Sequence, residues 1–336
     1  MTLPTMPLAA TGMNITRVGF GAWAIGGAGY PFGWGAQDDE ESVAAVRHAV
    51  ESGVNWIDTA AGYGLGHSEE IVARALADIS AVDRPYVFTK CGMIWDDSGP
   101  AGGTFNLVGA PGSIRREVDA SLRRLNADRI DLYQLHWPPQ DGTPIEETVA
   151  ALHELRTEGK IRAVGVSNCD VELLERTASV GGVDTLQPPF SAIKRDAAAE
   201  ILPYCAKRAI GVIVYSPMQA GLLTGSWSAR RSAQLPIDDW RSRSPDFTGE
   251  SLYRNLALVD ILRTVAKRHS TTVAAVAVAW TLAFDGVTGA IVGARRPAQV
   301  DDWINAGTLT MTTEDLDDIA MVIDRLGVGS GPSRPS

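Results

Sequence analysis

The feature that most constrains the fold of this chain is a regular alternation of short β-forming segments with amphipathic segments of helical period. Val43, Val46 and Val50, for example, mark the apolar face of one intervening helix. The candidate strands are the segments 17–20, 55–58, 86–90, 132–136, 163–167, 184–187, 211–215 and 289–292. Strands that alternate with helices pair in parallel, and eight such units are the number at which a parallel sheet closes. The sequence therefore predicts an α/β fold, a (β/α)8 TIM barrel.

Three stretches depart from the alternation. Residues before Arg17 are predicted to form a small hairpin around Thr11 and Gly12 that closes the barrel bottom. The segments 91–112 and 218–250 are long and irregular, and each follows the carboxyl end of a strand. Because barrel enzymes build their sites from such loops, we expect both segments at the barrel mouth, as lids or pocket walls.

No linker divides the chain. We therefore expect one domain over residues 1–326, and the Gly-, Ser- and Pro-rich residues 327–336 are expected to be a disordered tail.

Composition weighs against several partners and compartments. The formal net charge is -10 without a long basic run, which argues against nucleic acid or an anionic membrane as the main partner. The dipeptides Lys194-Arg195 and Arg230-Arg231 are interpreted as solvated charge pairs. The longest apolar stretch, 273–283, is too short to span a bilayer, and the first residues lack a secretory signal pattern. Three widely spaced cysteines favour neither a disulfide framework nor a metal site, so we expect a cytoplasmic protein without a metal.

Four chemically complementary side chains fall near the carboxyl ends of neighbouring predicted strands. Asp58 ends the second strand with Tyr63 shortly after it, Lys90 ends the third, and His136 ends the fourth. A lysine beside a phenol stabilises the phenolate and lowers the tyrosine pKa, and an aspartate keeps that lysine charged and oriented. An imidazole there orients a carbonyl or joins the proton relay. The set therefore suits protonation of a carbonyl oxygen while a hydride reaches the carbon.

The motifs around these residues resemble those of the aldo-keto reductase superfamily. The segment DTAAGYG at 58–64, followed by SE at 68–69, is similar to the family's DTAxxYG signature. The segments VFTK at 87–90, LYQLHWP at 132–138 and GVSN at 165–168 resemble its lysine strand, its histidine strand and its GVSN motif. The motifs occur in family order and in register with the predicted strands, over essentially the whole chain.

The resemblance implies an NADP(H)-dependent oxidoreductase that reduces aldehydes, aldoses or ketones to alcohols, or the reverse, by direct hydride transfer. Tyr63 is implied as the general acid/base, Lys90 and Asp58 as its tuning pair, and His136 as the residue that orients the substrate. The partner is then a small carbonyl or alcohol substrate, and self-association is left open.

The same resemblance implies contacts to the nicotinamide end of the cofactor. Ser167, Asn168 and Gln187 match the residues that bind the carboxamide, and Tyr215 matches the residue that stacks on the ring. Trp23 belongs to the same expected set.

Two further loops are implied to hold the phosphates. The expected contacts along the pyrophosphate are Ser216, Met218, Gln219, Gly221 and Leu222. Those around the adenosine 2′-phosphate are Gly293, Ala294, Arg295 and Gln299. The forked guanidinium of Arg295 suits a phosphate. Trp303 occurs where family members often carry an asparagine against the adenine, so adenine either stacks on Trp303 or loses this contact. NAD(H) therefore stays open as a cofactor.

The tryptophans are assigned to two roles, lining a substrate pocket or packing loops together. Trp95 and Trp137 follow strands that carry the predicted chemistry, so we expect them to wall a substrate pocket. Trp34 and Trp240 are assigned to ordinary loop packing.

The same fold is compatible with other functions. A glycoside hydrolase needs two carboxylates across the mouth, and only Asp58 ends a strand as a carboxylate. A regulatory subunit that binds the dinucleotide without turnover keeps the same fold, and the intact set of four residues weighs against it. An NAD-preferring sugar dehydrogenase on the same site is the remaining alternative.

Overall fold

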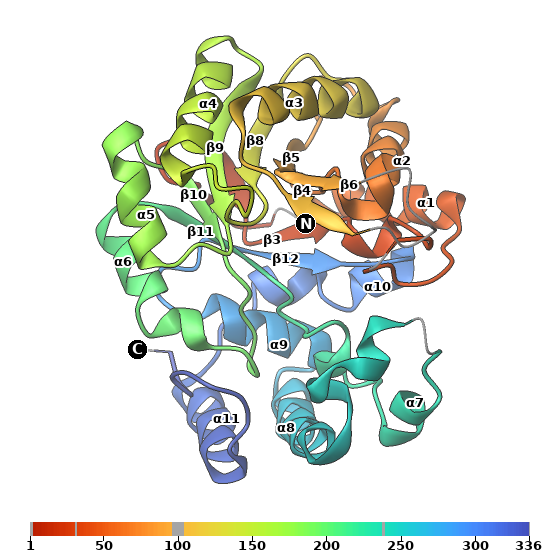
Figure 1. The fold of residues 1–336 in the computed structure, drawn as a ribbon. Coiled ribbons are helices and arrows are strands. Elements are labelled where there is room, and N and C mark those ends of the chain that lie inside the picture. Colours follow the sequence, from red (N-terminus) through yellow and green to blue (C-terminus); the bar gives the residue numbers. More distant parts are fainter. Residues whose placement is uncertain (1–2, 31, 96–103, 237–238, 336) are drawn as a thin grey trace.

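Eight parallel strands form a closed barrel in the computed structural model, which describes residues 3–30, 32–95, 104–236 and 239–335 (Figure 1). Around the barrel the order is β3, β4, β5, β8, β9, β10, β11 and β12. The strands are Val18–Gly21 (β3), Trp56–Asp58 (β4), Tyr86–Cys91 (β5), Ile130–Leu135 (β8), Ile161–Ser167 (β9), Thr185–Gln187 (β10), Gly211–Tyr215 (β11) and Gly289–Gly293 (β12). Each strand overlaps a predicted strand, and their bounds differ by at most two residues at either end. The predicted barrel is confirmed.

Helices surround the barrel on its outside (Figure 1). They are Asp39–Glu51 (α1), His67–Leu76 (α2), Pro111–Leu125 (α3), Ile145–Thr157 (α4), Val171–Thr177 (α5), Ile201–Lys207 (α6), Ala229–Ala233 (α7), Gly249–Arg268 (α8), Val273–Leu282 (α9), Pro297–Asp301 (α10) and Thr313–Leu326 (α11). Local sequence explains their ends: the Asp38 carboxylate accepts the Glu41 N–H at the start of α1, and Asn126 ends α3 with a φ of 48°. No helix in the described ranges is long and apolar enough to cross a membrane.

Short 3-10 helices lie in several of the connecting loops. They are Trp23–Ile25 (η1), Tyr63–Gly66 (η2), Ala178–Val180 (η3), Asp196–Ala198 (η4), Leu222–Thr224 (η5), Trp240–Arg243 (η6), Pro245–Phe247 (η7) and Ile304–Gly307 (η8).

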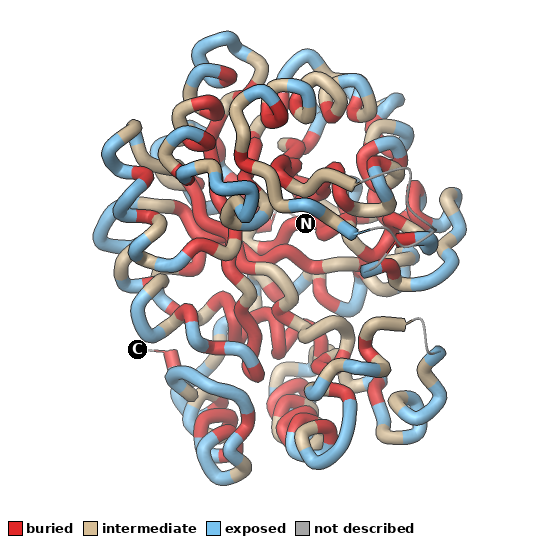
Figure 2. The backbone as a smooth tube through the Cα atoms, in the orientation of Figure 1, coloured by how far each residue is buried: buried red, intermediate tan, exposed pale blue. Residues whose placement is uncertain are grey.

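The apolar core has two parts, one inside the barrel and one between the barrel and its helices. Figure 2 shows buried residues concentrated along the strands and on the inner sides of the helices. The interior part contains Trp56, Phe88 and Leu132, and the amino-terminal hairpin adds Leu8 and Met13 to it. Because strand side chains alternate between the two faces, one set fills the interior and the other packs under the helices.

The amino-terminal hairpin closes the bottom of the barrel as expected. It consists of Thr5–Pro7 (β1) and Asn14–Thr16 (β2), which pair antiparallel. The Trp56 indole N–H donates to the Thr16 carbonyl at 2.8 Å and ties the hairpin to the barrel.

The two long segments at the mouth contain more regular structure than expected. In the segment 91–112, Met93–Trp95 (β6) pairs antiparallel with Phe105–Leu107 (β7), with Trp95 opposite Phe105. The segment 218–250 contains η5, α7, η6 and η7 in its described part. Both lie after carboxyl ends of barrel strands, where we expected them.

The carboxyl-terminal residues do not behave as the disordered tail that we expected. Residues 327–335 are described, and Val328 is buried. The Arg195 guanidinium donates to the carbonyls of Val328 and Pro332, each at 3.0 Å, and to that of Ala192 at 2.6 Å. Arg195 is only 2% exposed, so the interpretation of Lys194-Arg195 as a solvated pair is wrong for the arginine. The tail is held because this buried side chain needs carbonyl acceptors.

Candidate active site at the mouth of the barrel

The four candidate catalytic side chains meet at the carboxyl ends of β4, β5 and β8. Lys90 Nζ donates to the Asp58 carboxylate, to the Thr59 carbonyl at 2.9 Å and to Tyr63 Oη at 3.1 Å. The His136 ring lies edge-on to the Tyr63 ring, with 5.6 Å between centroids. Since Tyr63 Oη accepts a hydrogen bond from the lysine, its own O–H remains available for an incoming acceptor.

A tight turn after β4 brings Tyr63 to this position. The Tyr63 N–H donates to the Ala60 carbonyl at 3.1 Å, and Gly64 follows with a φ of 62°. A Cβ on Gly64 would lie 2.0 Å from the Gly26 carbonyl oxygen. The glycine is therefore required twice, for its backbone conformation and for the close approach of two loops.

Burial sets the protonation states of this cluster. Burial and then the charge of Asp58 raise the pKa of Tyr63, so the expected lowering of the tyrosine pKa is wrong for this structure. Burial lowers the pKa of Lys90, against the opposing effect of Asp58, and burial and then Lys90 lower the pKa of His136. At neutral pH the phenol is protonated and the imidazole is neutral, which leaves Tyr63 in the form of a proton donor.

The residues expected at the carboxamide form a connected group beside the four. Tyr215 Oη donates to Asn168 Oδ1 at 2.8 Å, and Asn168 Nδ2 donates to the His136 carbonyl at 3.0 Å. Asn168 has a φ of 58°, which asparagine tolerates better than most residues. Ser167 Oγ donates to the Gln187 carbonyl at 2.7 Å, while the Gln187 amide turns inward to Asp58 at 2.8 Å. The Gln187 side chain is thus bonded to the candidate catalytic cluster in this structure.

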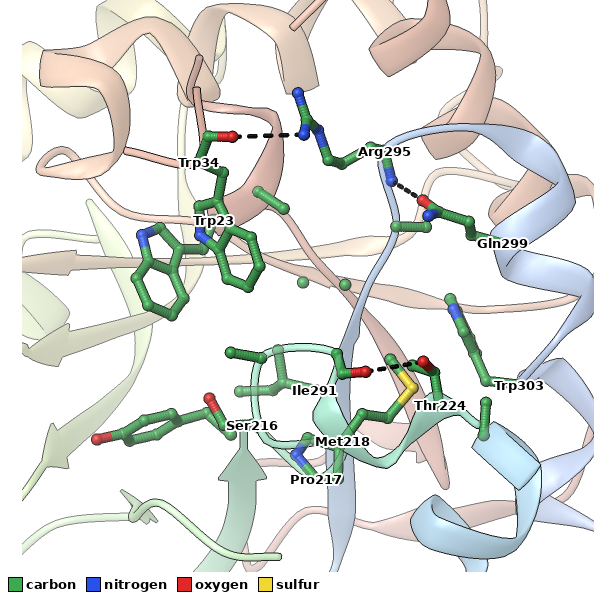
Figure 3. Close-up of a pocket in the computed structure, with 18 of the residues that line it drawn as sticks. Trp23, Trp34, Ser216, Pro217, Met218, Thr224, Ile291, Arg295, Gln299 and Trp303 are labelled. Carbon is green, nitrogen blue, oxygen red and sulfur yellow. Dashed lines mark hydrogen bonds between the residues drawn. The ribbon is translucent and has the colours of Figure 1, made fainter. Parts of the chain in front are cut away.

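One pocket extends from this cluster to the loop after β12 (Figure 3). The expected residues that line it are Asp58, Tyr63, Trp23, Tyr215, Ser216, Met218, Gly221, Gly293, Ala294, Arg295 and Gln299. In Figure 3, Ser216 and Met218 lie across the pocket from Trp23 and Trp34. Its walls come mainly from the carboxyl ends of β3, β4, β11 and β12 and from the loops that follow them.

Several expected contacts lie outside the pocket lining. The Gln219 side chain accepts from Ser191 at 2.9 Å and donates to Asp246 at 2.8 Å, which ties the loop after β11 to η7. Leu222 is fully buried in the outer core. Lys90 and Asn168 contact lining residues without lining the pocket themselves, through Tyr63 and Tyr215.

The predicted substrate wall is outside this pocket as well. Trp95 is half-buried in β6, and Trp137 is 39% exposed next to His136. Phe105, opposite Trp95, stacks on Phe32 with 6.3 Å between ring centroids. Contact of Trp95 and Trp137 with a substrate stays a prediction.

Sequence reasoning missed part of the pocket lining. The missed residues include Trp34, Thr224, Ser226, Trp227, Arg231, Arg241 and Asp302. Trp34 was assigned to loop packing but lines the pocket, whereas Trp240 stacks on Trp23 with 5.9 Å between centroids and does pack loops together. The available signal was the pair of tryptophans after the first barrel strand and the concentration of Trp and Arg after the seventh.

Two of the missed arginines are organised by tryptophan rings. The Arg241 guanidinium lies 4.7 Å from the Trp34 ring centroid and 5.0 Å from that of Trp227, and it bonds to Asp239 at 2.6 Å. Arg231 lies 4.3 Å from the Trp227 centroid. Arg231 is exposed, but it lines the pocket, so its interpretation as part of a solvated pair was incomplete.

Arg295 is held by neutral acceptors. Its Nε donates to Gln37 Oε1 at 2.5 Å, and its terminal nitrogens donate to the carbonyls of Trp34, at 3.4 Å, and Ala36. Gln299 Oε1 accepts the Arg295 backbone N–H at 2.7 Å (Figure 3). Among the described residues no carboxylate pairs with its guanidinium. The side chain is therefore oriented by neutral hydrogen-bond acceptors, which suits binding of an anion.

Trp303 is buried at the same end of the pocket. It is 1% exposed and packs in the outer core, with part of the residue on the pocket wall. Its neighbour Asp302 is exposed and also lines the pocket.

Comparisons with known proteins agree with this architecture. A model of the Aldo/keto reductase family matches residues 17–324. The NADH-specific methylglyoxal reductase of Escherichia coli (strain K12) is 36% identical over 322 residues, covering 93% of this chain and 95% of that protein. The structure of the glycerol dehydrogenase AKR11B4 of Gluconobacter oxydans has a TM-score of 0.87 at 36% identity and covers 97% of both chains. An aldo/keto reductase of Klebsiella pneumoniae, in complex with NADP and acetate, has a TM-score of 0.70 at 27% identity, covering 98% and 96%. This chain belongs to the aldo/keto reductase family.

Proposed function

We propose that this protein is an NADP(H)-dependent oxidoreductase that interconverts a small carbonyl compound and its alcohol by direct hydride transfer. The observation that carries the proposal is the hydrogen bond from Lys90 Nζ to Tyr63 Oη, 3.1 Å long, at the edge of the pocket. It directs the phenol O–H away from the lysine and toward the mouth, where a carbonyl oxygen would accept it.

Two observations support a nicotinamide dinucleotide in the pocket. The guanidinium of Arg295, held by neutral acceptors, fits an anionic group at the end of the pocket away from Tyr63. At the pocket wall, a Cβ on Gly21 would lie 2.8 Å from Ile291 Cγ2, so the wall is built from bare backbone there. A bound reduced nicotinamide supplies the hydride.

The residues of the chain then carry out the proton transfer. Tyr63 donates its proton to the carbonyl oxygen as the carbon is reduced, and Lys90 stabilises the phenolate that remains. Asp58 keeps Lys90 charged and oriented through the buried ion pair. Neutral His136 holds the carbonyl oxygen beside the phenol. In the oxidation direction the same phenolate takes the proton from the alcohol.

The choice of NADP(H) rests on Arg295. NAD(H) is the alternative, because one relative is NADH-specific and another binds NADP. The substrate is proposed as a small aldehyde, aldose or ketone, in keeping with relatives named for methylglyoxal reduction and glycerol oxidation.

The test is a fluorescence titration of the purified protein with NADPH and, in parallel, with NADH, followed by a panel of methylglyoxal, glyceraldehyde and 4-nitrobenzaldehyde. Tighter binding of NADPH and its oxidation by at least one carbonyl compound support the proposal. Binding without turnover of any carbonyl, or of glycerol and aldoses with the oxidised cofactor, supports the regulatory subunit instead. Absence of binding by both dinucleotides contradicts both functions.

A further inference from the structure

Two buried amide side chains meet the second oxygen of Asp58 inside the barrel. Gln134 Nε2, from β8, donates to Asp58 Oδ2 at 3.2 Å, and Gln187 Nε2, from β10, donates to the same oxygen at 2.8 Å. Gln187 Nε2 also lies 3.2 Å from Gln134 Oε1. Lys90 Nζ donates a hydrogen bond to the other oxygen, Asp58 Oδ1. Both oxygens of this carboxylate are therefore bonded, one to a cation and one to a pair of amides.

Gln134 is an exception in its surroundings. It is fully buried, and the inward-facing neighbours below it, such as Phe88 and Leu132, are apolar. A buried carboxamide is unfavourable unless its polar atoms are bonded, so an apolar side chain would fill this place at lower free energy. The bond to Asp58 is the feature of the site that only the amide provides.

The neighbouring strand leaves room for Gln134. A Cβ on Gly165, in β9, would lie 2.8 Å from Gln134 Cγ and 2.4 Å from Thr185 Oγ1. Gly165 thus makes space for two buried polar side chains at the same level. The Thr185 hydroxyl has no hydrogen-bond partner among the described residues, whereas the Gln134 amide reaches Asp58.

We propose that Gln134 is a positioning residue for proton transfer: with Gln187 it fixes the orientation of the Asp58 carboxylate and draws its negative charge toward Oδ2, away from Tyr63. The inference rests on the proposed function, because it assumes that Tyr63 exchanges the proton. The two amides differ in their surroundings. Gln187 also borders the residues expected at the nicotinamide carboxamide, whereas Gln134 contacts only the interior.

The charges around Tyr63 determine in which direction loss of the Gln134 amide shifts the ionisation of Tyr63. The groups that face Tyr63 or its lysine are Asp58, Lys90, His136, Tyr30, Tyr215 and Glu69. The charge of Asp58 is one of the causes that raise the pKa of Tyr63. Without the amide dipole of Gln134, that charge acts on the phenol more strongly. Ionisation of Tyr63 then requires a higher pH, and the carboxylate loses part of its orientation.

The experiment compares Gln134→Met, which keeps the length of the side chain without its donor, with Gln134→Glu, which is isosteric and donates only when protonated. Thr185→Val is the matched control, because it removes a buried polar atom at the same level without touching Asp58. For each protein, kcat and KM are measured for carbonyl reduction and alcohol oxidation across pH, together with the dissociation constant of the cofactor.

For Gln134→Met we expect kcat to fall about 10-fold, the effect of losing one hydrogen bond to a charged group, with the cofactor dissociation constant unchanged. In the pH profile of alcohol oxidation by this variant, the increase in rate toward alkaline pH should move to higher pH. Gln134→Glu should approach wild-type kcat at acid pH, where its carboxyl is protonated, and lose it as pH rises. Thr185→Val should keep the wild-type profile.

A pH profile of Gln134→Met that superimposes on the wild-type profile, whatever its kcat, overturns the proposal and leaves Gln134 a packing residue. If Gln134→Met does not fold, the pH dependence of Gln134→Glu alone decides between the two roles. If the wild-type protein reduces no carbonyl, the proposed function fails separately. In that case the phenolate absorbance of wild type and of Gln134→Met is measured as a function of pH. The Tyr63→Phe version of each protein supplies the signal of the other tyrosines, which is subtracted. The difference between the two corrected curves still tests whether Gln134 governs ionisation of Tyr63.

Discussion

Tyr63 shows how far the surroundings of a residue determine its chemistry. A phenol beside a lysine suggests a lowered pKa, but burial and the charge of Asp58 act in the opposite direction and raise it. We therefore propose that Lys90 stabilises the phenolate after proton transfer and does not ionise the phenol beforehand. This assigns the protonated tyrosine to the reduction direction.

Replacing the phenol tests that role directly. Tyr63→Phe removes the proton donor and keeps the ring, so kcat for carbonyl reduction should fall at least about 100-fold. Cofactor binding should stay nearly intact, because the ring still borders the pocket. Stopped-flow oxidation of NADPH and fluorescence titration give the two values. Near-normal turnover of this variant contradicts the assigned mechanism.

The pH dependence follows from the directions of two pKa shifts. The pKa of Tyr63 is raised and that of His136 is lowered, so neither group changes protonation between about pH 6 and pH 8. We expect kcat/KM for carbonyl reduction to be flat over this range, and alcohol oxidation, which requires the phenolate, to increase toward alkaline pH. A bell-shaped reduction profile centred near neutrality would show that one of these two groups titrates there.

Arg295 is the residue expected to distinguish the two cofactors. Arg295→Ala should weaken binding of NADPH by about 10-fold or more and of NADH much less, because only NADPH carries the 2′-phosphate. Arg296→Ala is the matched control, since the neighbouring arginine is exposed and does not line the pocket. The comparison is made by fluorescence titration. Equal losses for both cofactors in Arg295→Ala would remove this residue from the 2′-phosphate and limit it to holding the loop at Trp34 and Ala36.

At the level of elements, α8 and α11 are joined through one carboxylate. Asp315 accepts from the backbone N–H of Thr312 at 2.9 Å and from its hydroxyl at 2.8 Å, which forms a capping box at the start of α11. The same carboxylate accepts from Arg268 at 2.9 Å and from His269 at 2.6 Å, at the end of α8. Against the effect of burial, these bonds from His269, Thr312 and Arg268 lower the pKa of Asp315 to about 2.

This carboxylate should contribute to stability in a defined pH window. A folded pKa of about 2, below the usual ~3.9, stabilises the folded state by about 2 kcal/mol above pH ~4, and the contribution is lost as pH falls toward 2. Asp315→Asn should therefore lower the free energy of unfolding in urea by about that amount at neutral pH, and the difference from wild type should shrink in acid. Asp317→Asn, an exposed neighbour, should change it little. A difference that stays constant down to low pH would mean that hydrogen bonding alone, without charge, joins the two helices.

Element prediction succeeded where local pattern and tertiary environment agree. The eight barrel strands were predicted because each is apolar and followed by a helix of clear period. The β6–β7 hairpin was missed because its strands are only three residues long, and their pairing depends on packing against the turn at Gly62. Such short strands carry too little periodicity to be recognised.

For the whole molecule, the sequence was enough to predict the barrel, the hairpin at its bottom and the convergence of Asp58, Tyr63, Lys90 and His136. The reason is geometric: in a closed parallel barrel, the ends of all strands lie on one rim, so the position of a residue along its strand is enough to locate it. The family resemblance implied the same four residues and part of the lining of the pocket.

Features that depend on contacts between distant segments became visible in the folded chain alone, and the fold set them. It turned the Gln187 amide from the mouth to Asp58, placed Arg241 between Trp34 and Trp227, and fixed residues 327–335 on Arg195. It also reversed the expected direction of the Tyr63 pKa. Burial, hydrogen-bond partners and the local field are properties of the packed chain, and a linear pattern of residue types does not contain them.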